Sequence, residues 1–320
     1  MRVLITGATG LIGTEIVRLC HEKGIDVNYL TTRSSKISSE KAYQGFLWNP
    51  DKEEIDLKCF EGVSAIINLA GASISKRWTS SYKKEILSSR INTIQTLHNG
   101  LQKINTTQIT SFIAASAIGV YPTSLSNFYT ENDTRVDDSF LGEVVQAWEG
   151  ALQPLKKFAF NLAIIRVGLV ISNHGGALPE MAKPIKSYVG AAFGTGQQWQ
   201  SWIHITDVAR VFLYAVENQL QGVYNGVGPN PVTNTKLVKE IAKVLNRPIF
   251  LPNIPKFIMK LMLGQMSYIL FASQRVSSKK IEEEGFVFEY QNICRALEQS
   301  YPQNSKVASI DTSKDTKEFV

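Results

Sequence analysis

Three glycines near the start of the chain are placed so that bare backbone amides could bind an anion. Gly7, Gly10 and Gly13 follow an apolar run directly, and a helical pattern begins at about Leu11. Glycine at the first position allows a tight turn, glycine at the second lets a pyrophosphate approach the backbone, and glycine at the third lets the helix pack on the strand. The helix N-terminus adds free N–H groups and a positive dipole end. A strand-to-helix turn without a ligand is the alternative. The contacts expected with a dinucleotide are Gly7, Thr9, Gly10, Leu11, Ile12 and Gly13.

The end of the next apolar run indicates which dinucleotide would bind. An NAD site places Asp or Glu there for the ribose 2′-hydroxyl, whereas this run continues into Thr31-Thr32-Arg33-Ser34-Ser35-Lys36. The guanidinium of Arg33 offers a fork of donors for a phosphate, and serines stand beside it. We therefore expect NADP(H) rather than NAD(H), with an ordinary solvated loop arginine as the alternative.

A histidine and a carboxylate three residues apart, His204 and Asp207, could be taken for a general base or a metal site. The four histidines of the chain are scattered, so no metal set is expected. We expect His204 to serve a structural role, because a lone histidine is more often a satisfied partner than a ligand. The sequence contains no supported nucleophile–histidine constellation.

Buried strands and longer helical stretches alternate over the first two-thirds of the chain. The apolar runs do not alternate with polar residues and are rich in Val and Ile, which is typical of parallel strands covered on both faces. This order predicts an α/β fold, a Rossmann-like doubly wound parallel sheet with right-handed crossovers. The expected strands are Val3–Ile5, Asp26–Leu30, Ala65–Leu69, Phe112–Ala115 and Ala163–Val167, and the expected helices are Leu11–Lys23, Lys83–Leu101 and Leu141–Ala159 with an interruption at Pro154.

The pattern changes after about residue 171. Residues 172–196 are glycine-rich and are expected to leave the sheet and to line or cover a pocket. A strand at Gly222–Val227 and helices at Asn234–Leu245, Ile254–Phe271 and Ile293–Gln299 are expected to follow. We predict a Rossmann domain that binds NADP at 1–170, with 200–230 returning to it. A smaller C-terminal α+β substrate-binding part comprises 171–199 and 231–301, and a disordered tail is predicted at 302–320.

The composition is that of a globular protein. The chain has 320 residues, 44% of them apolar, and a formal net charge of +6. Three scattered cysteines predict reduced thiols and a cytoplasmic protein. The basic residues are dispersed, so no nucleic-acid partner is expected. The chain opens with a strand pattern rather than a signal peptide, and the apolar stretch Phe257–Ala272 is interrupted by polar residues, so no membrane partner is expected. We expect that stretch to be a helix packed on the body, with a membrane-surface or partner helix as the alternative.

Motifs along nearly the whole chain resemble one family. They are TGATGLIG, Asn68-Leu69-Ala70-Gly71, Lys76-Arg77-Trp78, Phe140-Leu141-Gly142-Glu143-Val144, Trp148-Glu149, Arg166-Val167-Gly168, Trp202-Ile203-His204-Ile205 and Gly285-Phe286-Val287-Phe288. Together they resemble the extended, epimerase-like branch of the short-chain dehydrogenase/reductase superfamily, and within it the atypical SDR39U1-like epimerase family. The resemblance implies an NADP(H)-binding protein that could form a homodimer through two of its helices. It also implies that Asp207 caps a helix at a strand-to-helix junction. The further cofactor contacts that it implies are Thr32 and Arg33 at the 2′-phosphate, Leu69 and Ala70 along the adenine and ribose, Glu85 and Arg90 on the following helix, and Val170 near the nicotinamide.

The superfamily's usual proton donor is missing. Short-chain reductases typically use a Tyr-x-x-x-Lys pair, and residues 110–170 contain none. Aligning Glu149 with the acidic residue that commonly follows this pair puts Leu141 at the tyrosine and Val145 at the lysine. Ser116 matches the superfamily serine. Tyr121 could supply a phenol, or it could be an aromatic on the pocket wall.

Two functions follow from these observations. The first is an NADP(H)-dependent oxidoreductase or epimerase-like enzyme that acts on a small carbonyl or sugar-nucleotide substrate, with Ser116 and Tyr121 as candidate catalytic residues. The second is an NADPH-binding sensor or regulatory protein that has kept the cofactor site and lost the proton relay.

Overall fold

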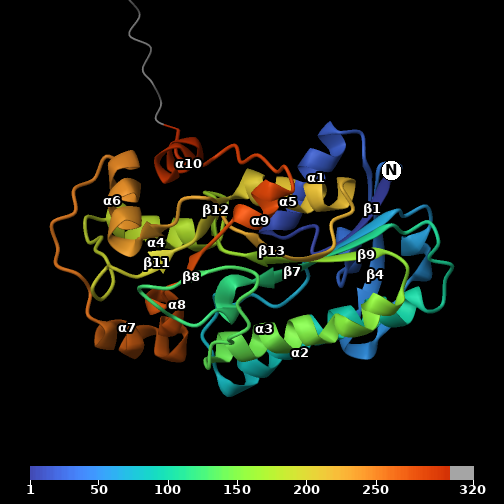
Figure 1. Ribbon diagram of the computed structural model, residues 1–320, viewed down its shortest axis with the longest axis horizontal. Coiled ribbons are helices and arrows are strands. Elements are labelled where there is room, and N and C mark those ends of the chain that lie inside the picture. Colours follow the sequence, from blue (N-terminus) through green and yellow to red (C-terminus); the bar gives the residue numbers. More distant parts are fainter. Residues whose placement is uncertain (303–320) are drawn as a thin grey trace, which may run out of the picture.

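A sheet that contains seven parallel strands runs through the larger part of the molecule, with helices on both of its faces (Figure 1). The computed structural model describes residues 1–302. The strand order is β13-β9-β7-β6-β1-β2-β4, and short antiparallel strands, β3 (Ser39–Glu40) and β5 (Glu54–Ile55), pair with β4. The order reverses at β1, which is where such sheets open a ligand crevice. The parallel strands are β1 (Arg2–Thr6), β2 (Asp26–Thr31), β4 (Tyr43–Asn49), β6 (Ala65–Asn68), β7 (Ser111–Ala117), β9 (Asn161–Val167) and β13 (Gly222–Gly226).

Helices cover both faces of the sheet. Helices α1 (Leu11–Glu22) and α5 (Ile205–Glu217) lie together on one face, and α2 (Ser80–Leu101) and α3 (Phe140–Ala151) lie on the other (Figure 1). The strands between them are apolar on both sides, as their continuous Val and Ile runs require, and their side chains form the main core. The prediction of a doubly wound α/β fold is confirmed.

A second, smaller core lies beyond the carboxyl ends of the strands. It joins α4 (Ala177–Lys186), α6 (Asn234–Val244) and α10 (Ile293–Ser300) to a parallel pair, β10 (Leu169–Ile171) and β12 (Trp202–His204). The remaining short elements are β8 (Phe128–Tyr129), β11 (Trp199–Gln200), β14 (Val232–Thr233), β15 (Arg275–Val276), α7 (Lys256–Leu263), α8 (Tyr268–Phe271) and α9 (Lys279–Glu283).

Some predicted elements are wrong in extent. The glycine-rich segment 172–196 contains helix α4, which packs into the second core. The helix predicted at Leu141–Ala159 ends at Ala151, because Pro154 cannot continue it and the chain passes into a 3₁₀ turn. The helix predicted at Ile254–Phe271 is divided at Gly264, whose φ is +60°. The predicted tail lies, except for Pro302, outside the described residues. None of the helices within residues 1–302 is long and apolar enough to cross a membrane.

Candidate cofactor and catalytic site

The glycine loop is packed so tightly that two of its glycines cannot be replaced without movement. Gly7 has φ +71°, and its carbonyl oxygen accepts a hydrogen bond from the N–H of Gly10 at 2.9 Å. A Cβ on Gly13 would stand 2.1 Å from that same oxygen and 2.7 Å from the Cα of Ala8. The third glycine therefore lets α1 begin directly against the turn, as the sequence motif predicts.

The N-terminus of α1 is free to receive an anion. No side chain within residues 1–302 caps it, and its first turn carries no acidic residue. Thr9 and Gly10 are exposed. They line, with Leu11, a cavity of about 280 Å³ whose other wall is formed by residues 172–175. A Cβ on Gly10 would meet only the Gly7 oxygen, at 3.2 Å, so the space over this residue is open. These bare amides fit the pyrophosphate of a dinucleotide.

Thr6 joins the glycine loop to the segment after β6. Its hydroxyl donates to the side-chain oxygen of Asn68 at 2.6 Å and accepts from the N–H groups of Leu69 and Ala70, both at 3.0 Å. A Cβ on Gly7 would lie 3.2 Å from the backbone of this segment. The structure therefore brings Leu69 and Ala70 beside the loop. The buried side-chain nitrogen of Asn68 has no hydrogen-bond partner in residues 1–302.

Arg33 stands at the end of β2 with its guanidinium unpaired. The residue is exposed, and it forms no ion pair with any residue of the described chain. Its backbone N–H donates to the hydroxyl of Thr31 at 3.2 Å, which turns the chain after the strand. No Asp or Glu occurs from Thr31 to Ser39. Thr32 is also exposed there. A free cation with neighbouring hydroxyls fits a 2′-phosphate better than a 2′-hydroxyl.

Arg90 holds the chain that follows Ala70. Its guanidinium donates to the carbonyl oxygens of Ala72 at 3.2 Å and Ile86 at 2.8 Å, and it lies 4.9 Å from the centre of the Trp148 ring. Burial lowers its pKa to about 10. Glu85 is exposed, and its side chain forms no hydrogen bond or ion pair within residues 1–302, so the structure does not join it to Arg90. Val170 lies half-buried in β10, paired with β12.

Ser116 is the first member of a buried polar network that crosses the carboxyl ends of three strands. Its hydroxyl donates to Glu149 at 2.6 Å, and Glu149 receives two hydrogen bonds from Arg166, both at 2.8 Å. Arg166 also donates to the hydroxyl of Tyr121 at 3.0 Å, and Tyr121 donates to the side-chain oxygen of Asn225 at 2.8 Å. The network thus holds Ser116 against an ion pair.

The candidate role of Tyr121 as a proton donor conflicts with its place in this network. The side chain is fully buried and stacks on Tyr129 with ring centres 5.2 Å apart. Burial raises the pKa of its phenol, and the nearby Arg166 opposes that shift only in part. The phenol hydroxyl of Tyr121 donates its hydrogen bond to the side-chain oxygen of Asn225. In the structure Tyr121 is thus buried within the polar network, hydrogen-bonded to Arg166 and Asn225.

The two positions that the sequence alignment through Glu149 assigns to the tyrosine and the lysine carry apolar side chains. Leu141 packs in a cluster with Trp78 and Phe140, whose rings meet edge to face at 5.2 Å. It also faces Gly119, just after β7. Val145 is buried one turn later in α3. Neither side chain can exchange a proton, so the classical acid–base pair is absent from this site.

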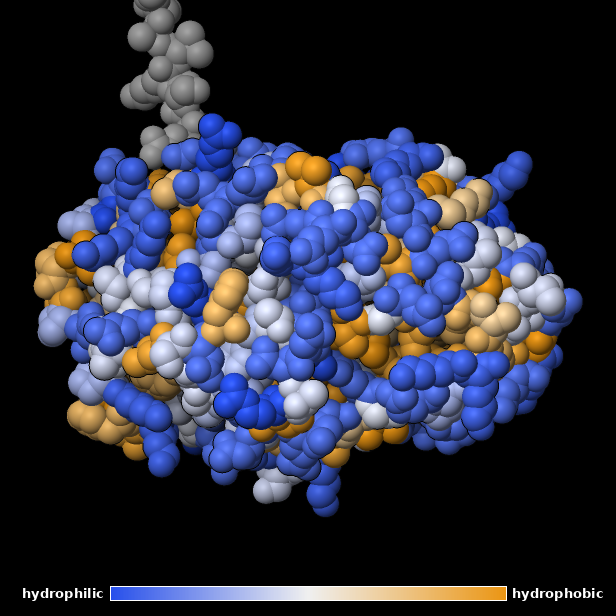
Figure 2. Space-filling view, viewed as in Figure 1, coloured by the Kyte–Doolittle hydropathy of each residue, from blue (hydrophilic) through white to orange (hydrophobic). Residues whose placement is uncertain are grey.

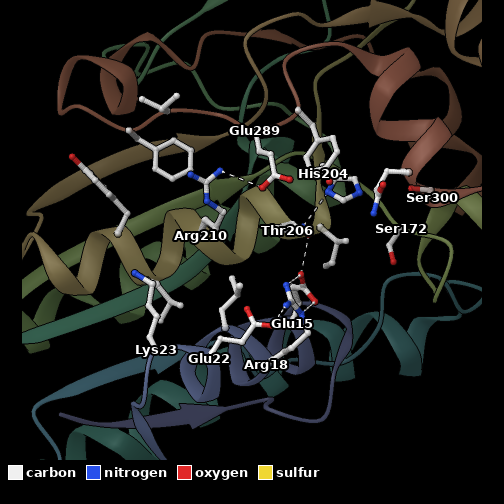
Figure 3. Close-up of a pocket in the computed structure, with 18 of the residues that line it drawn as sticks. Glu15, Arg18, Glu22, Lys23, Ser172, His204, Thr206, Arg210, Glu289 and Ser300 are labelled. Carbon is white, nitrogen blue, oxygen red and sulfur yellow. Dashed lines mark hydrogen bonds and ion pairs between the residues drawn. The ribbon is translucent and has the colours of Figure 1, made fainter. Parts of the chain in front are cut away.

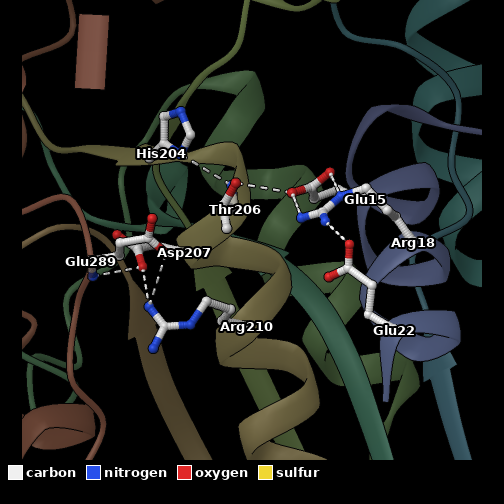
Figure 4. Close-up of polar contacts among 8 residues, drawn as sticks. All are labelled: Glu15, Arg18, Glu22, His204, Thr206, Asp207, Arg210 and Glu289. Atoms are coloured by element: carbon white, nitrogen blue, oxygen red, sulfur yellow. Dashed lines mark hydrogen bonds and ion pairs between the residues drawn. The ribbon is translucent and has the colours of Figure 1, made fainter. Parts of the chain in front are cut away.

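The prediction that Asp207 caps a helix is wrong. His204 is the N-cap of α5, and its Nδ1 accepts from the N–H of Thr206 at 3.3 Å. Asp207 is buried in the first turn, where it accepts from the N–H group of Glu289 at 2.9 Å (Figure 4). It also accepts from the N–H group of Tyr290 at 2.8 Å. The carboxylate therefore holds the C-terminal segment against α5. Burial lowers the pKa of His204, whose ring lies 3.9 Å from that of Tyr290.

A second cavity adjoins the one over the glycine loop and shares Glu15, Ser172 and His174 with it. It measures about 900 Å³ and lies between α1, α5 and the C-terminal segment (Figure 3). Several of its charged side chains pair with one another: Arg18 with Glu15 and Glu22, and Lys23 with Glu217. Arg210, also in the lining, pairs with Asp207 at 2.8 Å, and Glu289 lies 4.0 Å from Arg210. No group of three His, Cys, Asp or Glu side chains in residues 1–302 could hold a metal ion.

Comparisons with known proteins give consistent matches. Residues 3–226 match the NAD dependent epimerase/dehydratase family, and residues 254–300 match a domain of unknown function, DUF1731. Epimerase family protein SA0724 of Staphylococcus aureus is 36% identical over 296 residues, which cover 92% of this chain and 97% of that protein. Epimerase family protein SH2119 of Staphylococcus haemolyticus is 35% identical over 297 residues, with the same coverage.

Solved structures match over the same length. The human epimerase family protein SDR39U1, crystallised with NADPH, superposes with a TM-score of 0.82 at 27% identity, covering 94% of this chain and 99% of that one. A nucleoside-diphosphate sugar epimerase from Corynebacterium glutamicum superposes with a TM-score of 0.75 at 27% identity, covering 94% of this chain and 58% of that one.

Proposed function

Because this chain belongs to the NAD dependent epimerase/dehydratase family, we propose that it is an NADP(H)-dependent oxidoreductase of the epimerase-like short-chain type. Its substrate would be a small carbonyl compound or a sugar nucleotide. The unpaired guanidinium of Arg33 beside the open glycine loop is the observation that carries the choice of cofactor. NADPH in the similar human protein supports the same choice.

The residues that would hold the cofactor follow the edge of the sheet. The amides at the start of α1 would bind the pyrophosphate, and Arg33 would bind the 2′-phosphate. Leu69 and Ala70, held by Thr6, would lie along the adenine and ribose. Val170 would stand near the nicotinamide. When bound, NADPH supplies the hydride, and the protein supplies its orientation toward the substrate.

Ser116 is the polar group that we assign to the substrate oxygen. Its proton points to Glu149, so the lone pairs of its oxygen face away from that carboxylate and can accept a hydrogen bond from a substrate hydroxyl. Arg166 keeps Glu149 in place through two charge-assisted hydrogen bonds. Ser116 is 3% exposed, so a substrate would reach it only from the strand end.

One observation favours a second function, an NADPH-binding sensor or regulatory protein. The proton-transfer positions are held by Leu141 and Val145, and Tyr121 is buried and hydrogen-bonded. A protein of this kind would bind the cofactor tightly and leave it unchanged, and it would signal through a partner.

Three measurements on the purified protein separate these functions. Calorimetry with NADPH and NADH tests the cofactor proposal, which fails if neither releases heat. Absorbance at the NADPH band, followed with a panel of carbonyl compounds and nucleotide sugars, tests for turnover. Steady oxidation that Ser116→Ala abolishes supports the enzyme. Tight NADPH binding with no turnover on the panel, together with an NADPH-dependent partner, supports the sensor.

The cellular setting and the oligomeric state are also proposals. We place the protein in the cytoplasm because its three cysteines are free thiols, and burial raises the pKa of Cys20 to about 12. A homodimer through α2 and α3 follows from analogy with extended relatives. Sedimentation velocity of the purified chain tests it directly.

A further inference from the structure

The outer side of α7 carries large apolar side chains that no part of residues 1–302 covers. Phe257 is 71% exposed, Leu261 is 82% exposed and Met262 is 64% exposed. Ile258 lies on the same side of the helix, and only Met259 is buried against the body. The prediction that this stretch packs on the body is therefore wrong for α7. Isolated apolar residues are normal on a surface, but one helix side formed wholly of them indicates a binding surface.

The apolar surface extends to the chain that leads into α7. Phe250 and Leu251 are exposed on this connection, which runs down the left side of the view from α6 to α7 (Figure 1). The space-filling view shows apolar side chains gathered at the left edge and the lower left of the molecule (Figure 2). We call α7 together with Phe250 and Leu251 the α7 surface.

The stretch of chain that contains α7 carries only basic charged residues. Between Glu240 and Glu282 the sequence contains no acidic residue. Lys256 and Lys260 are exposed on α7 itself, one turn apart, and neither forms an ion pair with a residue of the described chain. The basic residues of this interval are Lys243, Arg247, Lys256, Lys260, Arg275, Lys279 and Lys280.

We propose that the α7 surface docks on an anionic lipid bilayer. A short helix with Phe and Leu on its outer side and lysines at the edge matches the interfacial mode of membrane binding. Apolar side chains would enter the boundary between headgroups and acyl chains, and Lys256 and Lys260 would remain at the level of the negative headgroups. An eight-residue helix is too short to do more than lie on the surface.

The charge pattern argues against a second copy of the chain as the occupant. A two-fold contact through the α7 surface would bring Lys256 and Lys260 of both copies to the same interface. No acidic side chain within residues 241–281 could pair with them. An anionic bilayer provides both an apolar interior and the opposite charge.

The chain that follows α7 packs on helices of the sheet domain. The chain after α7 contributes Met266 and Ile269, which pack with Leu141 and Trp78 in one apolar cluster. The chain that follows α7 thus contacts helix α3 and the segment before α2 through Met266 and Ile269.

Vesicle flotation of the full-length protein tests this proposal. We expect the protein to float with vesicles of phosphatidylglycerol and phosphatidylcholine, and to remain unbound with phosphatidylcholine alone. Raising the salt concentration should weaken the binding. Lys256→Glu with Lys260→Glu should weaken it by at least about 30-fold, since each lysine near such a surface contributes about 5-fold.

A pair of matched variants separates the α7 surface from general stickiness. Phe257→Ser with Leu261→Ser should abolish flotation, whereas Leu47→Ser with Val287→Ser, also exposed, should leave it unchanged. NADPH affinity and the urea midpoint should match the wild type in both. No flotation with anionic vesicles, or equal flotation with neutral ones, overturns the proposal. The proposal is also overturned if the wild type and the Leu47/Val287 variant are dimers and the Phe257/Leu261 variant is monomeric. In that case the α7 surface binds a second copy of the chain.

Discussion

Replacing Gly10 with alanine separates the cofactor site from the stability of the fold. Gly10 has φ −82° and ψ 175°, an extended backbone that alanine adopts without strain. The new Cβ would meet only the carbonyl oxygen of Gly7, at 3.2 Å, so the neighbour must yield by a few tenths of an ångström. Alanine is also a slightly poorer N-cap than glycine. We therefore expect the free energy of unfolding to fall by no more than about 1 kcal/mol.

The effect on NADPH binding should be larger than the effect on folding. The open space over Gly10 is where the pyrophosphate would approach the backbone, and a methyl group would occupy part of it. Overpacking of a close contact costs about 1–3 kcal/mol. Since about 1.4 kcal/mol changes an equilibrium constant tenfold, the Kd for NADPH should rise by roughly 5- to 150-fold.

Two control variants make the result specific. Gly150→Ala places a Cβ where no atom lies within 4 Å, on an exposed turn of α3, and should leave NADPH affinity unchanged. Gly13→Ala forces a Cβ to within 2.1 Å of the Gly7 oxygen and should lower both stability and affinity. The measurements are NADPH titration by calorimetry and urea unfolding. If Gly10→Ala binds NADPH as tightly as the wild type, the glycine loop is not the pyrophosphate site.

Three further predictions concern the charged groups. Arg33→Ala should weaken NADPH binding by about 10- to 100-fold through loss of a charge-assisted hydrogen bond, while NADH binding stays constant; equal effects on both would refute the 2′-phosphate assignment. Glu149→Gln leaves the buried Arg166 without its carboxylate and should lower the free energy of unfolding by about 3–5 kcal/mol, measured in urea, and a loss below about 1 kcal/mol would show that the pair is screened by solvent. Burial lowers the pKa of His204, so the unfolded chain binds its proton first as the pH falls below the usual histidine value of about 6.5. The stability that this residue contributes is therefore complete above that pH and decreases below it. Urea midpoints should fall less steeply between about pH 7 and 5 in His204→Gln than in the wild type, and parallel profiles would contradict the assignment.

The sheet could be predicted where strands are continuous apolar runs, and not where they are mixed. Strands β1, β2, β6, β7 and β9 were predicted within three residues of their observed limits because each buries both faces. Strand β4 was missed because its sequence, YQGFLWN, has neither a Val and Ile run nor a clear alternation. Its Gly45 is explained only in three dimensions, since a Cβ there would lie 2.6 Å from the ring of Tyr29.

The cofactor loop could be predicted because all its determinants are local, whereas the catalytic region depends on distant partners. The loop motif, the strand before it and the helix after it occupy adjacent positions in the chain. The hydrogen bond from Ser116 to Glu149 joins residues 33 positions apart, and that from Tyr121 to Asn225 spans 104. No spacing rule indicates such pairs, so the sequence could not predict that Tyr121 is buried against Arg166 and Asn225.

The choice between enzyme and sensor depends on Ser116 more than on the missing tyrosine and lysine. A site without a titrating donor can still orient a substrate oxygen, provided that one polar group at the strand end is held rigidly. The ion pair of Glu149 and Arg166 supplies that rigidity here. Apolar side chains at these positions would avoid the desolvation penalty of a buried ion pair. A protein that only sensed NADPH would need the glycine loop and Arg33, but it would have no use for a serine held by a buried ion pair. If Ser116→Ala changes turnover while leaving NADPH affinity intact, the network serves chemistry. If it changes neither stability, affinity nor turnover, the network has no functional role at this position.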